Sequence, residues 1–127
     1  MRIYVDTVIM IFRVERVMPH NAKISARFGQ SGVVQVISDV TRMECLVKPI
    51  RANDVSLIRE FQFAFDATEI VTMEPDVFDL AARIRADYNF KTPDSLHLAA
   101  AKYSGCDLFY THDYRLQKYA GLQVEIL

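Results

Sequence analysis

Short apolar runs recur along the chain, and they predict five β-strands. The runs are rich in valine, isoleucine, leucine, phenylalanine and tyrosine, whose branched or aromatic side chains favour strands. Runs that are mostly apolar, rather than alternately apolar and polar, are typical of a parallel sheet that is covered on both faces. The predicted strands cover residues 3–5, 33–37, 69–71, 108–110 and 123–126.

Longer stretches with helical spacing separate the predicted strands. In residues 54–65, apolar side chains lie three and four positions apart, which places them on one face of a helix. Residues 75–88 begin with Pro75 and Asp76, two residue types that favour the first turn of a helix. In all, helices are predicted over residues 8–18, 21–28, 40–47, 54–65 and 75–88, and a sixth begins near Asp94.

Proline sets several of the predicted helix ends, because it lacks the N–H that an interior position needs. Pro19 separates the first two helices, and Pro49 follows the predicted end of the third. For the sixth helix we expect Thr92 as the N-cap and Pro93 as the first helical residue. Its apolar residues lie on more than one side, so we expect this helix to be packed inside the domain.

The alternation of strands and helices predicts an α/β fold with a mostly parallel central sheet. The chain has 127 residues, 51% hydrophobic and 24% charged, so it can bury a core without disulfides or structural metal. This composition excludes a disordered chain, a collagen and a disulfide scaffold. Neither a repeat nor a linker interrupts the pattern, and we therefore expect residues 1–127 to form a single domain.

Charge and cysteine content narrow the class of protein. The formal net charge is −1, which does not resemble a dedicated DNA-binding domain. Cys45 and Cys106 lack the spacing of a metal site, so we expect buried thiols in a reducing compartment. The first apolar stretch is broken by Arg13, Glu15 and Arg16, which argues against a signal peptide or a membrane span. We therefore expect a cytoplasmic protein without membrane contact.

Four carboxylates are predicted to meet at one edge of the sheet. Asp6 and Asp113 follow predicted strands, Asp94 lies in the first turn of a helix, and Glu44 lies in the helix after the second strand. Clustered carboxylates repel one another and would take up protons. A bound cation prevents this, because it stabilises the ionised form. Oxygen ligands suit Mg²⁺ or Mn²⁺, whereas the His and Cys spacings of a Zn²⁺ site are missing.

Each acid also has an ordinary structural interpretation. Aspartate after a strand is a common turn residue, and aspartate in a first helical turn interacts with the helix dipole. Glu44 could form a capping box with Thr41, because the two are three residues apart. That interpretation fails if Ser38 or Asp39 is the true N-cap, since Glu44 then lies too deep in the helix.

These acids lie in four segments, at residues 3–7, 38–49, 92–101 and 109–113. Together the four segments resemble the PIN-domain ribonucleases, specifically the VapC-like toxins of toxin–antitoxin systems. The resemblance implies a three-layer α/β/α domain and Mg²⁺- or Mn²⁺-dependent endonucleolytic cleavage of RNA. It also implies a catalytic and metal-binding role for Asp6, Glu44, Asp94 and Asp113. The matching segments are Ile-Tyr-Val-Asp-Thr at residues 3–7, residues 38–49, Thr-Pro-Asp-Ser-Leu-His at the start of residues 92–101, and Phe-Tyr-Thr-His-Asp at residues 109–113.

Neighbouring residues extend the resemblance and mark its departures. Thr7 and Thr111 match hydroxyl positions that would orient the carboxylates or water. Val8 and His112 stand where many members of the family have asparagine, which puts catalytic strength in more doubt than metal binding. His97 lies one helical turn after Asp94, and both it and His112 are candidate substrate contacts. A surface histidine or a hydrogen-bonded core histidine is the alternative for each.

The expected partners are an RNA substrate, a cognate antitoxin and a second copy of the chain. The helix over residues 8–18 has more apolar side chains than one core-facing stripe needs, so it could offer a groove to the antitoxin or to a homodimer partner. A catalytically weak module that binds RNA or protein is the main alternative function. A phosphoacceptor signalling domain is a further alternative, but it expects lysine where this chain has Asp113.

Overall fold

All five strands run parallel in one sheet. The computed structural model describes residues 1–127 and orders the strands β3-β2-β1-β4-β5. The predicted strands are confirmed to within one residue at each end. Their bounds are β1 (Arg2–Val5), β2 (Val34–Ser38), β3 (Glu69–Val71), β4 (Leu108–Thr111) and β5 (Gln123–Ile126).

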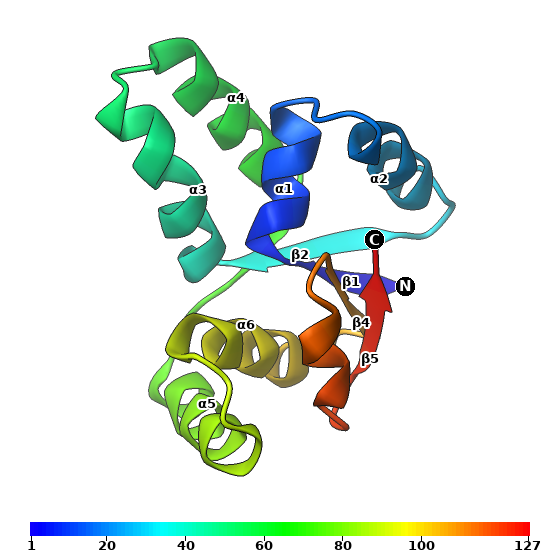
Figure 1. The fold of residues 1–127 in the computed structure, drawn as a ribbon, viewed down its shortest axis with the longest axis vertical. Coiled ribbons are helices and arrows are strands. Elements are labelled where there is room, and N and C mark those ends of the chain that lie inside the picture. Colours follow the sequence, from blue (N-terminus) through cyan, green and yellow to red (C-terminus); the bar gives the residue numbers. More distant parts are fainter.

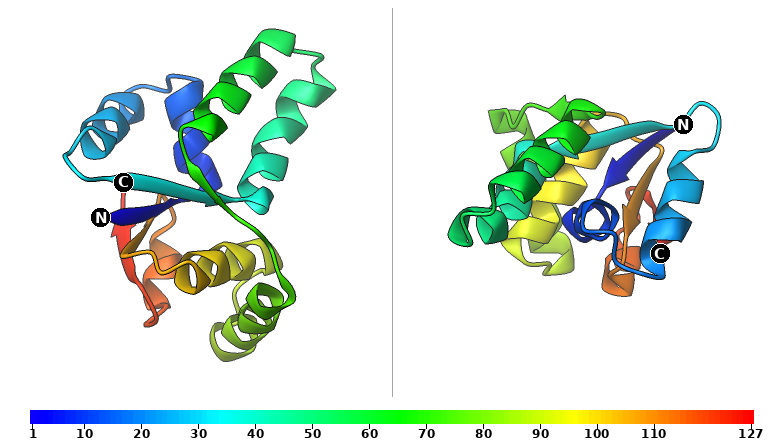
Figure 2. Two further views of the ribbon diagram at one scale, coloured as in Figure 1. Left: turned by 180° about the vertical axis from the view of Figure 1, so that it is seen from behind. Right: turned by 90° about the horizontal axis from the view of Figure 1, so that it is seen from above.

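Helices cover both faces of this sheet, which confirms the three-layer α/β/α fold. Four helices lie on one side and two lie on the other with a short 3-10 helix (Figure 1). The view from behind shows the same separation of the two helical layers (Figure 2). The helices are α1 (Thr7–Val14), α2 (His20–Phe28), α3 (Asp39–Arg51) and α4 (Val55–Asp66) above the sheet, and α5 (Pro75–Tyr88), α6 (Thr92–Tyr103) and the 3-10 helix η1 (Tyr114–Lys118) below it.

Successive residues of β1 point to opposite faces and enter separate cores. Ile3 and Val5 pack with α1 and α4, whereas Tyr4 packs with α5 and α6. All three side chains are fully buried, as expected for a central parallel strand. The ring of Tyr4 stacks on Phe109 of β4 with 5.2 Å between centroids. The two cores therefore hold the sheet edge, and the residues that follow it, in a fixed position.

Helix α6 is buried as predicted. Leu98, Ala99, Ala100 and Ala101 are fully buried, and Ala side chains allow close approach to the sheet and to α5. The predicted cap of this helix is wrong, because Lys91 is the N-cap and Thr92 and Pro93 occupy the first two helical positions. Proline is tolerated there because the first four N–H groups of a helix have no partner inside it.

Two other predicted helix ends are also wrong. The helix predicted over residues 8–18 ends at Val14, since Arg16 adopts a left-handed φ of 54° that helical backbone cannot follow. The helix predicted over residues 40–47 continues through Pro49 to Arg51. Pro49 is buried and lies in the last turn, so only one helical hydrogen bond is lost near an end that frays in any case.

The apolar side chains of α1 pack wholly or partly against the core. Ile9, Met10 and Val14 are buried, and the remaining apolar residues of this helix pack partly against the same core. Both cysteines are buried and free, as predicted. None of the helices combines the length and apolar character needed to cross a membrane.

Candidate functional site

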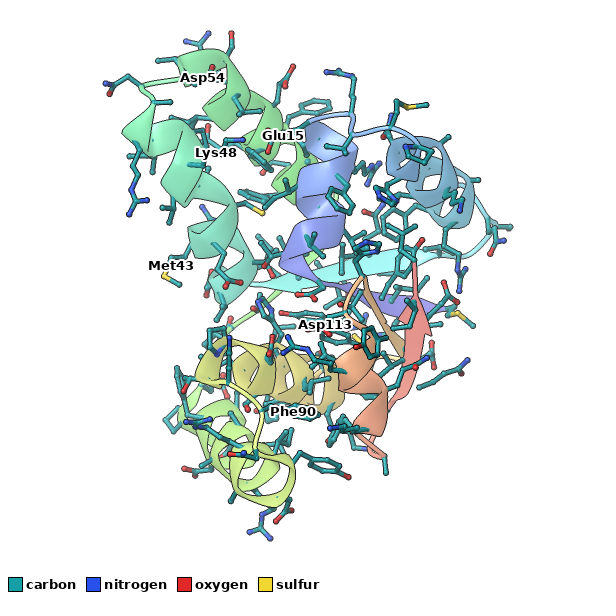
Figure 3. The ribbon with its side chains drawn as sticks, viewed as in Figure 1. Glu15, Met43, Lys48, Asp54, Phe90 and Asp113 are labelled. Carbon is teal, nitrogen blue, oxygen red and sulfur yellow. The ribbon has the colours of Figure 1, made fainter.

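The four predicted acids line one cleft of about 380 Å³ at the carboxyl-terminal edge of the sheet. They come from the ends of β1 and β4, from α3 and from the first turn of α6. Asp113 lies between the two helical layers (Figure 3). Parallel strands bring their carboxyl ends to the same edge, which explains why distant segments meet here. The other residues that line the cleft are Thr7, Val8, Ile11, Pro93, His97 and His112.

Asp6 is held by the start of α1 and by β4. It is the N-cap of α1, and its Oδ1 accepts a hydrogen bond from the Thr7 N–H at 2.8 Å. Its Oδ2 accepts a second hydrogen bond from Thr111 Oγ1 at 2.7 Å. The Thr111 hydroxyl is itself fixed, because its oxygen accepts from the Asp113 N–H at 3.1 Å. The carboxylate at the end of β1 is therefore oriented before any ligand arrives.

Glu44 is held by two donors from other elements. Its Oε1 accepts from Thr7 Oγ1 at 2.7 Å and lies 2.6 Å from His97 Nε2. Burial acts to raise the pKa of Glu44, but the hydrogen bonds from His97 and Thr7 outweigh it and hold that pKa below its ordinary value. Glu44 does not cap α3, because Ser38 is the N-cap and its N–H bonds Thr41 Oγ1 at 3.3 Å.

His97 lies beneath Glu44 inside the protein. The residue is 2% exposed, and its Nδ1 lies 2.7 Å from the Tyr4 hydroxyl. The pKa of Glu44 is held low, so its ionised carboxylate accepts from His97 Nε2. Tyr4 in turn hydrogen-bonds Ser38 Oγ at 2.8 Å. Both ring nitrogens are engaged by protein, which favours a role in positioning Glu44 over direct contact with substrate.

Asp113 is neutralised by its own neighbour. Arg115 Nη2 lies 2.5 Å from Asp113 Oδ2, and Arg115 Nε donates to Oδ1 at 2.9 Å. These charge-assisted hydrogen bonds hold the pKa of Asp113 below its ordinary value. Lys91 adds a weaker charge in the same direction. Asp113 is therefore the acid that the protein compensates with a full positive charge.

Asp94 is the acid with the least compensation. Burial is the largest cause of its raised pKa, and the charges of Asp6 and Asp113 raise that pKa further. Arg115 and His97 oppose the shift without cancelling it. Ionisation of the half-buried Asp94 is thus opposed by burial and by repulsion from its neighbours, and a cation in the cleft would stabilise the ionised form.

The chemistry of these donors fits a hard divalent cation, although the side chains are not closed around one point. No group of three or more His, Cys, Asp or Glu residues is placed to hold a metal ion together. Asp6, Glu44 and Asp113 instead engage protein donors. Mg²⁺ or Mn²⁺ would bind carboxylate oxygens in such a cleft, where burial and like charges raise the pKa of Asp94.

Sequence reasoning missed the partners of these acids. The ion pair of Arg115 with Asp113 and the contact of Tyr4 with His97 were not predicted. The position of Arg115, two residues after Asp113, was a usable signal, whereas the contact between Tyr4 and His97 joins residues far apart in the chain. His112 lines the cleft and is exposed, as a substrate contact would need to be.

Comparison with known proteins agrees with this architecture. The PIN domain family model matches residues 3–122. VapBC2 from Rickettsia felis, bound to a DNA fragment from its promoter, superposes with a TM-score of 0.81 at 12% identity over 99% of this chain and 98% of that chain. A toxin–antitoxin complex from Klebsiella pneumoniae gives 0.73 at 21% identity over 94% and 93%.

A third solved structure has a more specific description. VapC20 from Mycobacterium tuberculosis, described as a sarcin-ricin loop cleaving toxin, gives a TM-score of 0.76 at 12% identity over 95% of this chain and 98% of that chain. At such identities the superpositions show a shared fold. A search of curated proteins finds no significant match.

Proposed function

Because the chain belongs to the PIN domain family, we propose that it is a Mg²⁺- or Mn²⁺-dependent endoribonuclease that acts as the toxin of a toxin–antitoxin pair. The observation that carries this proposal is the convergence of Asp6, Glu44, Asp94 and Asp113 on one cleft. Four distant segments contribute one acid each, and burial together with the charges of Asp6 and Asp113 raises the pKa of Asp94. A purely structural role for every acid would not require this convergence.

Each residue of the cleft has a separate role in the proposed reaction. The four acids would hold a divalent ion, which would supply activation of a water and stabilisation of the charge on a phosphodiester. Thr7 and Thr111 aim the carboxylates of Glu44 and Asp6 into the cleft. His97 keeps Glu44 ionised and oriented. Arg115, beside Asp113, is placed to meet a phosphate of the RNA backbone.

RNA as substrate and a toxin role rest on the structural neighbours. The Mycobacterium tuberculosis neighbour is described as a toxin that cleaves the sarcin-ricin loop, and the Klebsiella pneumoniae neighbour as a toxin–antitoxin complex. Their fold extends over nearly the whole of this chain. We also propose a cytoplasmic location, since both cysteines are free thiols.

The cleavage test compares metals on one RNA pool. Purified protein is incubated with structured and single-stranded RNA in Mg²⁺, in Mn²⁺ or in EDTA, with a DNA pool of the same sequences as the control. We expect internal cuts in RNA with either metal and none in EDTA. Cleavage that persists in EDTA contradicts the metal requirement. RNA binding without cleavage in any buffer would support the catalytically weak binding module instead.

Two exposed apolar surfaces are proposed for the protein partners. On α3, Met43, Val47 and Ile50 are 61%, 43% and 56% exposed at helical spacing, and Met43 projects from the helix in Figure 3. We propose that this apolar stripe meets the same stripe of a second copy of the chain. A groove between α1 and α4 contains Phe63, which is 81% exposed. Three arginines and one glutamate also line it, so its positive excess suits an acidic segment of the antitoxin.

The two surfaces are distinguished by matched substitutions. We expect the protein to sediment as a dimer at micromolar concentration and Ile50→Glu to sediment as a monomer, because a charge then lies in the proposed dimer surface. Phe63→Glu, an equally drastic change at another exposed position, should remain dimeric. A monomeric wild-type chain, or loss of the dimer in both variants, contradicts the assignment of the α3 stripe.

A further inference from the structure

Three aromatic rings from distant segments meet beside the acidic cleft. We call Phe12, His20 and His112 the aromatic rim. Phe12 and His20 are stacked, with 4.6 Å between centroids and 11° between planes. His112 meets both rings edge-on, at 5.5 Å from Phe12 and 5.0 Å from His20. The rim thus joins α1, the start of α2 and the end of β4 in one packed group.

His112 is the member of the rim that faces the site. It lines the same cleft as the four acids. Its chain neighbours also belong to the site, because Asp113 lines the cleft and Thr111 hydrogen-bonds Asp6. Its Nδ1 lies 3.2 Å from the carbonyl oxygen of Leu127, so Nδ1–H donates and the ring is oriented. The other two rings support it from outside the cleft, which leaves an exposed but fixed aromatic ring next to the acids.

The cleft also contains apolar surface from α1. Its hydrophobic lining residues are Val8 and Ile11, from the helix that carries Phe12 of the rim. Lys91 and Arg115 lie on the other side of the sheet edge, in an adjoining pocket of about 240 Å³ that shares Asp94. One side of the acids therefore offers aromatic and apolar surface, and the other offers positive charge.

We propose that the aromatic rim binds an unpaired RNA base adjacent to the phosphodiester at the acids, with His112 as the stacking ring. This inference rests on the proposed nuclease function. A base inside a duplex is covered on both faces by its neighbours, so it cannot stack on a protein ring, whereas a base in a single strand or loop can. Stacking on an aromatic side chain is tolerant of base identity, so the rim selects unpaired RNA rather than one sequence.

The test combines a substitution in the protein with removal of a base in the RNA. The cut site of the wild type is mapped first, and the same RNA is then made with an abasic nucleotide at each position flanking the cut. His112→Ala removes the ring, and His112→Phe restores an aromatic ring of similar size. The control measurements are the melting temperature and the Mn²⁺ affinity of each variant, which we expect to match the wild type.

We expect His112→Ala to lower kcat/KM on single-stranded RNA by about 5- to 150-fold, mainly through KM, which corresponds to the loss of one stacked base. His112→Phe should stay within a few-fold of the wild type. Removal of one flanking base should slow the wild type by the same factor and slow His112→Ala no further. That equivalence identifies the base that stacks on His112, since a merely structural role would add to the loss.

Failure of the rim and failure of the nuclease give different results. If the wild type makes no cut, the proposed function and the rim proposal are both overturned. If the cut is mapped but His112→Ala cleaves as fast as the wild type, only the rim proposal is overturned. The rim proposal is also overturned if His112→Phe is as slow as His112→Ala. It is overturned as well if removal of each flanking base slows His112→Ala by the same factor as the wild type.

Discussion

Replacement of Asp94 by asparagine should reduce RNA cleavage by about 10²- to 10³-fold, because one charged ligand of the proposed metal is lost. The change should not destabilise the metal-free protein. Asparagine has the same shape without the charge, and the charge of Asp94 is disfavoured by burial and by the charges of Asp6 and Asp113. The folded state is then relieved of repulsion while the cleft loses its proposed function.

The sign of the pH dependence follows from the raised pKa. A carboxyl whose pKa is higher in the folded than in the unfolded state weakens the fold once the pH exceeds its unfolded value. Below that value both states are protonated and Asp94 has no such effect. In EDTA we therefore expect Asp94→Asn to melt at the wild-type temperature in acid and at a higher temperature than the wild type near neutral pH.

Asp76→Asn is a matched control for this experiment. Asp76 follows Pro75 in the first turn of α5, as Asp94 follows Pro93 in the first turn of α6, so both lie near the positive end of a helix dipole. Asp76 is exposed and outside the cleft. Mg²⁺ should raise the melting temperature of the wild type and Asp76→Asn but not of Asp94→Asn. Full activity in Asp94→Asn would contradict the assigned site.

The fold could be predicted from the sequence where hydrophobic pattern alone decides structure. The buried positions of β1 and β4 are apolar except for Thr111 at the end of β4, and the boundaries of both strands are correct to one residue. The helix ends were harder, because they depend on single backbone conformations. The left-handed Arg16 and the buried Pro49 have no signature in the pattern. The 3-10 helix η1 is too short to show a hydrophobic period.

The candidate site shows a similar division. Parallel topology places Asp6 and Asp113 at one edge of the sheet, and this follows from sequence order alone. The donors that tune each acid depend on side-chain rotamers and on contacts across the fold. His97 reaches Glu44 across 53 positions of the chain, a contact that a pattern confined to neighbouring residues does not reveal.

The pair formed by His97 and Glu44 leads to the second large effect. His97→Asn should weaken Mn²⁺ binding by about 10- to 100-fold, since its shorter side chain places an amide near the former Nδ1 and leaves Glu44 without this donor. His97→Gln should have a smaller effect, because its longer side chain can carry an N–H to the former Nε2 position. Both changes remove the ring, so their difference isolates the hydrogen bond to Glu44.

The measurement is a titration of Mn²⁺ by calorimetry at several pH values, with cleavage rates taken in parallel. Without the hydrogen bond from His97, burial is opposed by Thr7 alone, and the pKa of Glu44 rises. A carboxyl with a higher pKa loses its metal at a higher pH. The pH at which Mn²⁺ binding is half lost should therefore move upward in His97→Asn and remain near the wild-type value in His97→Gln.

Tyr4→Phe tests whether the Tyr4 hydroxyl orients the His97 ring, because it removes that hydroxyl without changing the Nε2 side of the ring. The hydroxyl lies 2.7 Å from His97 Nδ1, and its removal leaves a buried nitrogen without that partner while Nε2 still faces Glu44. We expect an effect on Mn²⁺ affinity that is smaller than that of His97→Asn. If the asparagine and glutamine variants lose metal affinity equally, the ring acts by packing alone. If neither loses it, Thr7 is sufficient to position Glu44, and His97 is a core residue that happens to lie beneath the site.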